Sequence, residues 1–216
     1  MQKFALNDVT GTLWTPVDEP KAWVLVAHGG GQHSQAPGVV ARAEHFVSTL
    51  GCGVLALDAP GHGGRPTDEG AMDEIRRRKA AGEPIGPLIA AMNAERAAQA
   101  VPEWRAALDE LAITTPVGFW GVSLGTAIGV PLVASEPRIT CAVLGLLGPV
   151  DGAADIHVPV EFLVQWDDEL VPRANALALF EALGSAEKTL HANPGRHVEV
   201  PRFEIESAER FFRRHF

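Results

Sequence analysis

The sequence predicts an α/β fold in which a mainly parallel, twisted sheet is flanked by helices. Two observations support this fold class. Short continuous apolar runs, such as those at 23–27 and 54–57, are typical of strands that are buried on both faces. Stretches with apolar residues at helical spacing, such as 38–50, lie between these runs. This alternation of buried strand and amphipathic helix is typical of a parallel sheet with crossover helices.

The elements begin with an antiparallel edge hairpin, predicted at residues 2–6 and 11–15 around the turn-forming stretch 7–10. A long Ala-rich helix is expected over about 88–111, with a kink at Pro102. The later strands are expected at 116–120, 141–147, 160–166 and 187–191, and the later helices at 126–135, 174–183 and 203–216.

Residues 64–89 interrupt this alternation. They contain several Gly and Pro residues and the basic run Arg76-Arg77-Arg78-Lys79, but no strand pattern. A connection of this length inside a compact domain is usually a lid or a binding loop. We therefore expect a short lid insertion at 64–89, with a disordered surface excursion as the alternative. The basic run is expected to be a solvated helix face or, as part of a lid, to contact an anionic substrate.

Length and composition favour one domain spanning 1–216, because 216 residues are enough to bury a core and 46% of them are hydrophobic. The net charge of −9 repels phosphate backbones and anionic lipids, which disfavours nucleic-acid and membrane partners. No apolar run is long enough to span a bilayer, and the first residues lack the pattern of a signal peptide. Cys52 and Cys141 have apolar, strand-like surroundings, so buried free thiols and a cytoplasmic location are expected.

The pentapeptide Gly121-Val122-Ser123-Leu124-Gly125 follows an apolar run and precedes a predicted helix. In this strand–turn–helix context, a G-x-S-x-G pattern places the serine at the tip of a sharp, strained turn with its Oγ exposed. The two glycines remove side chains that would clash in such a turn. A chance match on a glycine-rich turn is the alternative, and the context favours Ser123 as a nucleophile.

A serine hydroxyl needs a neighbouring base, and that base is in turn oriented by a carboxylate. In a parallel sheet such groups are expected in loops after the carboxyl ends of strands. Asp168 follows the predicted strand at 160–166, and His197 follows the last predicted strand. The order Ser123, Asp168, His197 matches that of enzymes with a serine on such a turn. These three residues are the predicted catalytic triad.

Other residues compete for two of these roles. Asp167 is an alternative acid, with Asp168 then acting as a charge at a helix N-terminus. Asp151, in the loop after the preceding strand, is a second alternative acid. His191 is an alternative base, although it lies within a strand pattern rather than beyond it.

The run His28-Gly29-Gly30-Gly31 follows the strand at 23–27. Acyl transfer passes through an oxyanion, which needs preorganised N–H donors. One donor is expected from the amide of Leu124, as part of the serine turn. The second is expected from the amide of Gly30, because glycine lets this loop lie close to a substrate. These two amides are the predicted oxyanion hole.

Three further residues are candidate substrate contacts. Gly29 lies in the same glycine-rich loop as Gly30, and Trp120 and Trp166 lie at the ends of central strands. The two tryptophans are expected to form the floor of a substrate pocket. The other tryptophans are expected in the core.

Five motifs together resemble the α/β-hydrolase superfamily over roughly residues 20–216: His28-Gly29-Gly30-Gly31, Asp58-Ala59-Pro60-Gly61-His62-Gly63, Gly121-Val122-Ser123-Leu124-Gly125, Asp168-Glu169-Leu170-Val171-Pro172 and Gly195-Arg196-His197. The compact size is similar to that of its small esterase and dienelactone-hydrolase-like members. Dienelactone hydrolases carry cysteine at this turn, so Ser123 points away from that exact activity. The resemblance implies Ser123 as nucleophile, His197 as base and Asp168 as its orienting acid. It also implies a structural role for His62, and His28 is expected to fix its own loop by hydrogen bonding.

The predicted function is hydrolysis of a small-molecule carboxylic ester, thioester or lactone through an acyl-serine intermediate. No cofactor is predicted. His33, His45, His157 and His215 are scattered without ligand-like spacing, so no metal site is predicted. One alternative is a different chemistry on the same fold, namely acyl transfer, carbon–carbon bond hydrolysis or cofactor-free perhydrolysis. The other is a non-catalytic binding protein, which would be expected to lack a triad member.

Overall fold

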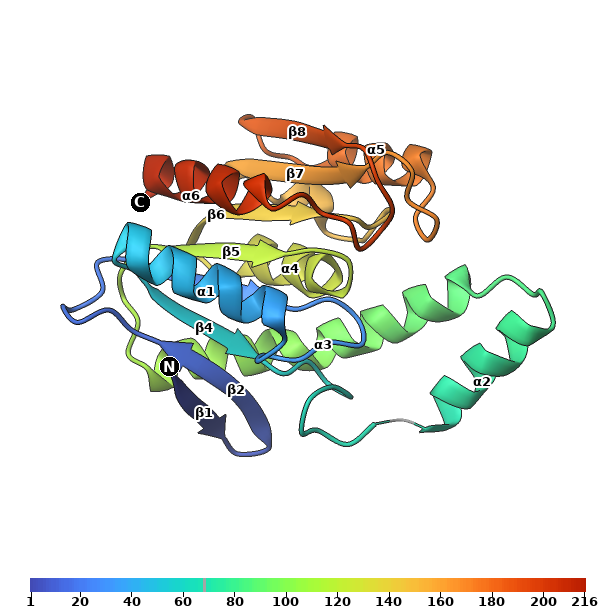
Figure 1. Cartoon of the computed structure of the whole chain (residues 1–216), viewed down its shortest axis with the longest axis horizontal. Coiled ribbons are helices and arrows are strands. Elements are labelled where there is room, and N and C mark those ends of the chain that lie inside the picture. Colours follow the sequence, from blue (N-terminus) through green and yellow to red (C-terminus); the bar gives the residue numbers. More distant parts are fainter. Residues whose placement is uncertain (68) are drawn as a thin grey trace.

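An eight-stranded sheet organises the computed structural model, which describes residues 1–67 and 69–216 (Figure 1). The strands are β1 (Gln2–Leu6), β2 (Val9–Trp14), β3 (Trp23–Ala27), β4 (Gly53–Leu57), β5 (Val117–Gly121), β6 (Ile139–Gly145), β7 (Val160–Gln165) and β8 (Lys188–Asn193). Their order in the sheet is β1-β2-β4-β3-β5-β6-β7-β8. β1 and β2 form an antiparallel hairpin, β2 pairs antiparallel with β4, and the other pairs are parallel.

Helices cover both faces of this sheet (Figure 1). They are α1 (Pro37–Leu50), α2 (Glu69–Ala80), α3 (Gly86–Glu110), α4 (Leu124–Ser135), α5 (Arg173–Ala182), α6 (Phe203–His215) and the short 3-10 helix η1 (Ala153–Asp155). On one face α1 and α6 pack through Phe46 and Phe212, whose rings meet edge to face. On the other face α3, α4 and α5 bury Trp104, Ile128 and Leu179. The predicted α/β fold, with a mainly parallel sheet flanked by helices, is confirmed.

The predicted edge hairpin is present, with a shorter turn than expected. Leu6 pairs with Val9, so only Asn7 and Asp8 form the turn, and Asn7 has a φ of 51°. Two-residue hairpin turns need residues that tolerate positive φ, and asparagine is one of them. For this reason β2 begins two residues earlier than the expected strand.

The two cysteines are free and buried, as predicted. Burial raises the pKa of both the Cys52 and the Cys141 thiols to about 12. A thiol with so high a pKa carries almost no thiolate at neutral pH, so these residues act as small core side chains.

Helix α2 occupies much of the predicted lid at 64–89, of which Asp68 lies outside the described residues. Within α2, Glu74 forms ion pairs with Arg77 and Arg78, and pairs at this spacing stabilise a helix. None of the residues described in α2 is buried, and α2 projects from the carboxyl edge of the sheet with the first turns of α3 (Figure 1). The basic run is therefore a solvated helix face, one of the two roles predicted for it.

Within the described chain, no helix is both long and apolar enough to cross a membrane.

Candidate active site

The turn between β5 and α4 holds Ser123 in a strained backbone conformation. Ser123 has φ 57° and ψ −118°, a combination that residues other than glycine rarely adopt. The positions that flank Val122, Ser123 and Leu124 must be glycine, because a side chain there would collide with backbone atoms. A Cβ on Gly121 would lie 2.8 Å from the carbonyl oxygen of Gly125, and one on Gly125 would lie 2.6 Å from that of Ala27. The turn therefore has no room for larger residues on either side of the serine.

Thr126 joins this turn to the neighbouring strand β6. Its buried Oγ1 lies 2.6 Å from the carbonyl oxygen of Gly145 and 2.9 Å from that of Gly121, and it accepts a hydrogen bond from the Gly145 amide at 2.8 Å. The Ser123 amide donates to the same Gly145 carbonyl at 3.0 Å. These contacts fix the serine relative to two central strands. Thr126 has no assigned role in the sequence pattern, and its function is visible only from these contacts.

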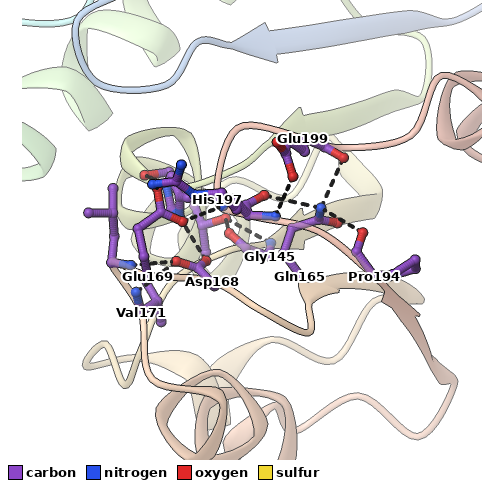
Figure 2. Close-up of polar contacts among 12 residues, drawn as sticks. Gly145, Gln165, Asp168, Glu169, Val171, Pro194, His197 and Glu199 are labelled. Carbon is purple, nitrogen blue, oxygen red and sulfur yellow. Dashed lines mark hydrogen bonds and ion pairs between the residues drawn. The ribbon is translucent and has the colours of Figure 1, made fainter.

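His197 and Asp168 complete a hydrogen-bonded chain with Ser123. His197 Nε2 lies 3.0 Å from Ser123 Oγ, and its Nδ1 lies 2.7 Å from Asp168 Oδ2. The other Asp168 oxygen accepts hydrogen bonds from the amides of Leu170 and Val171 at 2.8 and 2.9 Å (Figure 2). The side chains of His197 and Asp168 are only 9% and 4% exposed. The serine thus has a base within hydrogen-bond reach, and that base has a buried, oriented carboxylate partner.

The alternative acids and the alternative base make other contacts. The Asp167 carboxylate accepts from the Gly195 amide at 3.4 Å. Asp151 is exposed in the turn before η1. His191 lies within β8, as its sequence pattern predicts, and its ring contacts Glu204 of α6 at 3.0 Å. Of the three candidate acids, Asp168 is the one that contacts the His197 ring.

Two residues to which no motif assigns a role hold the loop that carries His197. Glu169 Oε2 accepts the His197 amide at 3.0 Å, and Oε1 pairs with Arg196 at 3.2 Å. The hydrogen bond from the His197 amide lowers the pKa of the Glu169 carboxyl. Gln165 Nε2 donates to the carbonyl oxygens of Arg196 and Glu199 at 3.2 and 3.0 Å (Figure 2). Hydrogen bonds from a side chain to backbone atoms require no particular partner residue, so no sequence pattern predicts them.

His28 fixes its own loop by hydrogen bonding, as predicted. Its Nδ1 donates to the Gly29 carbonyl at 2.8 Å, and its Nε2 accepts from the Ala59 amide at 3.0 Å, so the ring joins the loops after β3 and β4. Burial lowers the pKa of His28 to about 4, which keeps the ring neutral at physiological pH. His62 packs beside it with 5.2 Å between the ring centres and hydrogen-bonds the Pro60 carbonyl at 3.0 Å.

The amides predicted to form the oxyanion hole lie on adjoining turns. β3 pairs with β5 up to Ala27 and Gly121, so the turn after β3 adjoins the turn that carries Ser123. Leu124 is the first residue of α4, where an amide has no acceptor within the helix. Gly30 is exposed, and a Cβ there would meet no described atom within 4 Å. Leu124 is itself buried, whereas Gly30 lies at the surface, and the oxyanion hole formed by their two amides stays a prediction.

Trp120 lies in the core, and its predicted place on a pocket floor stays a prediction. It is 3% exposed beneath α1, where the Arg42 guanidinium lies 4.0 Å from the ring centre. Successive residues of a strand face opposite sides of the sheet. Phe119 faces the side of α4, and Trp120 consequently faces the side of α1.

Trp166 and Gly29 lie at the surface near the hydrogen-bonded chain. Trp166 is 41% exposed, and the Arg173 guanidinium stacks on its ring at 3.8 Å. With Ala192 and Pro194 it lines a shallow depression of about 290 Å³ that includes no triad residue. Gly29 is partly exposed beside Gly30. Either residue is accessible to a ligand at the carboxyl edge of the sheet.

A serine on a strained strand-to-helix turn, with an acid and a histidine on later loops of a mainly parallel sheet, is the arrangement of α/β-hydrolases. Comparison with solved structures gives the same class. The PEG-bound complex of a cold-adapted esterase from an Arctic intertidal metagenomic library is 33% identical, with a TM-score of 0.79 over 100% of this chain and 92% of the other. A zinc-bound structure with the same description is 31% identical, with a TM-score of 0.74 over 99% and 92% of the two chains. A monoacylglycerol lipase from Paleococcus ferrophilus, 17% identical with a TM-score of 0.68 over all of both chains, shares the fold.

The chain therefore belongs to the α/β-hydrolase superfamily, as its motifs predicted, and is an esterase-like member of it. No protein-family model matches the chain, and no curated protein matches it. The similarity to the cold-adapted esterase supports a hydrolase that acts on small-molecule esters.

Proposed function

We propose that this chain is a serine hydrolase that cleaves carboxylic esters through an acyl-serine intermediate. The observation that carries the proposal is the hydrogen-bonded chain from Asp168 through His197 to Ser123, with distances of 2.7 and 3.0 Å. The similarity to esterases supports the substrate class. Thioesters and lactones present the same kind of reacting carbonyl group and fall within the proposal.

Acylation begins when Ser123 Oγ attacks the substrate carbonyl carbon and His197 Nε2 takes its proton. Asp168 holds the required tautomer of the ring through Nδ1 and stabilises the imidazolium that forms. The amides of Leu124 and Gly30 donate to the oxyanion of the tetrahedral intermediate. His197 then protonates the leaving alcohol, and the acyl group remains on Ser123.

Deacylation repeats these steps with water as the nucleophile. His197 takes a proton from the water as its oxygen attacks the acyl-serine carbonyl. Collapse of the second tetrahedral intermediate releases the acid and returns the proton to Ser123 Oγ. The steps use only the residues named, the ester and water, so no cofactor is part of the proposal.

The arm formed by residues 69–85 is proposed to act as the lid that selects substrates by size. It projects from the carboxyl edge of the sheet, the edge at which Ser123, Asp168 and His197 meet (Figure 1). None of the residues described in α2 is buried, so the arm contributes little to the core. Every group in the proposed mechanism lies outside it, which separates substrate selection from chemistry.

The proposal is tested with p-nitrophenyl esters of increasing acyl length and with a fluorophosphonate label. We expect hydrolysis of the short esters and one label per chain, found on Ser123 by mass spectrometry of the labelled peptide. Hydrolysis with the label on another residue, or an intact chain that neither hydrolyses esters nor accepts the label, would refute it. Preferential transfer of the acyl group to an added alcohol rather than to water would instead indicate an acyltransferase.

A further inference from the structure

A second cluster of polar side chains lies between β7, the edge strand β8 and α6. It consists of Glu161 of β7, His191 of β8 and Glu204 of α6, and one possible ligand atom from each lies within 4.8 Å of the other two. His191 Nδ1 is 3.0 Å from a Glu204 oxygen, and its Nε2 is 3.6 Å from a Glu161 oxygen. The proposed mechanism uses none of these residues.

The two carboxylates of this cluster are almost completely buried. The side chains of Glu161 and Glu204 are 5% and 4% exposed, and that of His191 is 29% exposed. A buried carboxylate is destabilising unless a partner neutralises it. The cluster therefore places two carboxylates side by side where water has little access.

One oxygen of Glu161 has no partner. Its Oε1 is buried and accepts no hydrogen bond from any described residue, whereas Oε2 accepts from the Ser207 hydroxyl at 3.2 Å. Glu204, by contrast, is held by His191 and by the Asn193 side-chain amide at 2.8 Å. Buried acceptors without a donor are rare in folded proteins and indicate an unaccounted partner. Next to a second carboxylate and an imidazole, a bound cation would supply that partner.

We propose that Glu161, His191 and Glu204 bind a divalent transition-metal ion. Two carboxylate oxygens and one imidazole nitrogen are ligands that suit Zn²⁺, and three protein ligands leave a position for water. Ligand atoms at ordinary zinc distances are on the order of 3.4 Å apart in a tetrahedral site. The ligand atoms lie within 4.8 Å of one another, with Nδ1 of His191 facing Glu204 and Nε2 facing Glu161. Side-chain rotations that bring both carboxylates to one ring nitrogen would give that spacing.

The segment between two of these ligands carries His197. His191 and Glu204 bracket residues 194–202, which join β8 to α6. An ion held by both residues fastens α6 to the edge strand and fixes the two ends of this segment. We therefore expect the ion to act on the position of this segment. Metal binding would change activity by changing the position of the His197 ring, an expectation that rests on the proposed function of His197.

The sequence predicts no metal site, because its histidines show no ligand spacing. The three ligands proposed here come from three different elements. They are brought together by the pairing of β7 with β8, in which Leu163 lies opposite His191, and by the packing of α6. No local pattern in the sequence contains that information.

The test uses zinc alone, on the full chain after metal removal by a chelator. We expect the wild-type chain to bind one Zn²⁺ and to melt at a higher temperature with zinc than without it. In His191→Ala we expect zinc affinity to fall more than about 100-fold, because losing a ligand costs more than losing one of its supporting partners. His45→Ala is the matched control: His45 contacts Glu209 of α6 at 2.8 Å, outside this cluster, and its loss should leave zinc binding unchanged.

Glu161→Gln keeps the size of the side chain and removes its charge, so it tests the site even if His191→Ala fails to fold. We expect it to stay folded by circular dichroism and to bind zinc at least about tenfold more weakly than the wild type. Failure of the wild type to bind micromolar zinc, or equal binding by the wild type, His191→Ala and Glu161→Gln, would overturn the proposal. Ester hydrolysis by the metal-free chain is measured separately, so the metal site and the proposed function can fail independently.

Discussion

The turn that carries Ser123 and the arm at residues 69–85 lie at the same edge of the sheet and are built in opposite ways. Around Ser123, neither Gly121 nor Gly125 has room for a methyl group, and Thr126 ties the turn to β6. In the arm none of the residues described in α2 is buried, and the ion pairs that Asp73 and Glu74 form with the basic run join residues one turn apart. A Cβ on Gly82 would meet no described atom within 4 Å.

This difference indicates where chemistry and selectivity are expected to reside. A strained residue persists only where its surroundings over-determine its conformation, as they do at Ser123. A segment without buried apolar contacts opens at a low free-energy cost, which describes the arm. We therefore expect substitutions in the turn and its partners to change the rate of chemistry, and changes in the arm to alter substrate preference.

Removal of the nucleophile has the largest expected effect. Ser123→Ala should lower kcat for p-nitrophenyl acetate by a factor on the order of 10⁴ or more and abolish fluorophosphonate labelling. Ser48→Ala is the control, because the Ser48 hydroxyl donates to the His45 carbonyl at 3.0 Å on an exposed face of α1, away from Ser123. Labelling that survives in Ser123→Ala would contradict the role assigned to the turn.

Substitution of the orienting acid should be the next most severe change. Asp168→Asn should lower kcat by roughly 10³ to 10⁴, because an amide in this position favours the wrong tautomer of His197. Asp167→Asn, one residue away, and Asp151→Asn should keep most of the activity. A mild Asp168→Asn together with a severe Asp151→Asn would move the acid to the loop after β6.

The packing of the turn can be tested without touching a reacting group. In Gly125→Ala the new methyl group would lie 2.6 Å from the Ala27 carbonyl oxygen, so β3 and α4 must separate. We expect the free energy of unfolding, measured in urea, to fall by about 1–3 kcal/mol, with a parallel fall in kcat. Gly86→Ala, at the start of α3, adds its methyl group to open space and should change neither quantity. Equal effects of the two substitutions would show that the turn is not tightly packed.

Replacement of the arm, residues 69–85, by a short Gly-Ser link should have the smallest effect on chemistry. Arg65 is kept, because its guanidinium bonds both Glu103 oxygens, at 2.6 and 2.7 Å, and anchors the preceding loop to α3. We expect several-fold changes in KM and in chain-length preference across an ester series, with turnover of the acetate ester retained. Loss of acetate turnover in a chain that is folded by circular dichroism would place a catalytic group in the arm.

Much of the sheet could be predicted, because strands that are buried on both faces require continuous apolar residues. β3 lies where its apolar run indicated, and α1 lies where apolar residues recur at helical spacing. α2 could not be predicted in this way. None of its described residues is buried, so its sequence does not need the apolar periodicity by which a helix is predicted. Ion pairs between charged side chains stabilise it instead.

The three residues predicted as a triad contact one another in the folded chain, because the loops that carry them follow strands of the same sheet. The side of the sheet that Trp120 faces could not be predicted, because periodicity does not distinguish the faces of a strand that is buried on both. Glu169 and Gln165 were missed because they bond to backbone groups, which are the same for every residue type. What the sequence lacks at these positions is the register between strands, which appears only in the folded chain.

Ser123 and His197, the proposed catalytic pair, follow strands of different local stability. Ser123 follows β5, a central strand, whereas His197 follows β8, which is the edge strand and in which Asn193 alone is buried. Edge elements detach at a lower free energy than the whole domain needs to unfold. Moderate heating is therefore expected to abolish ester hydrolysis while most of the sheet stays folded. Recovery on cooling then requires only that one edge docks again, so the loss of activity should be rapid and reversible.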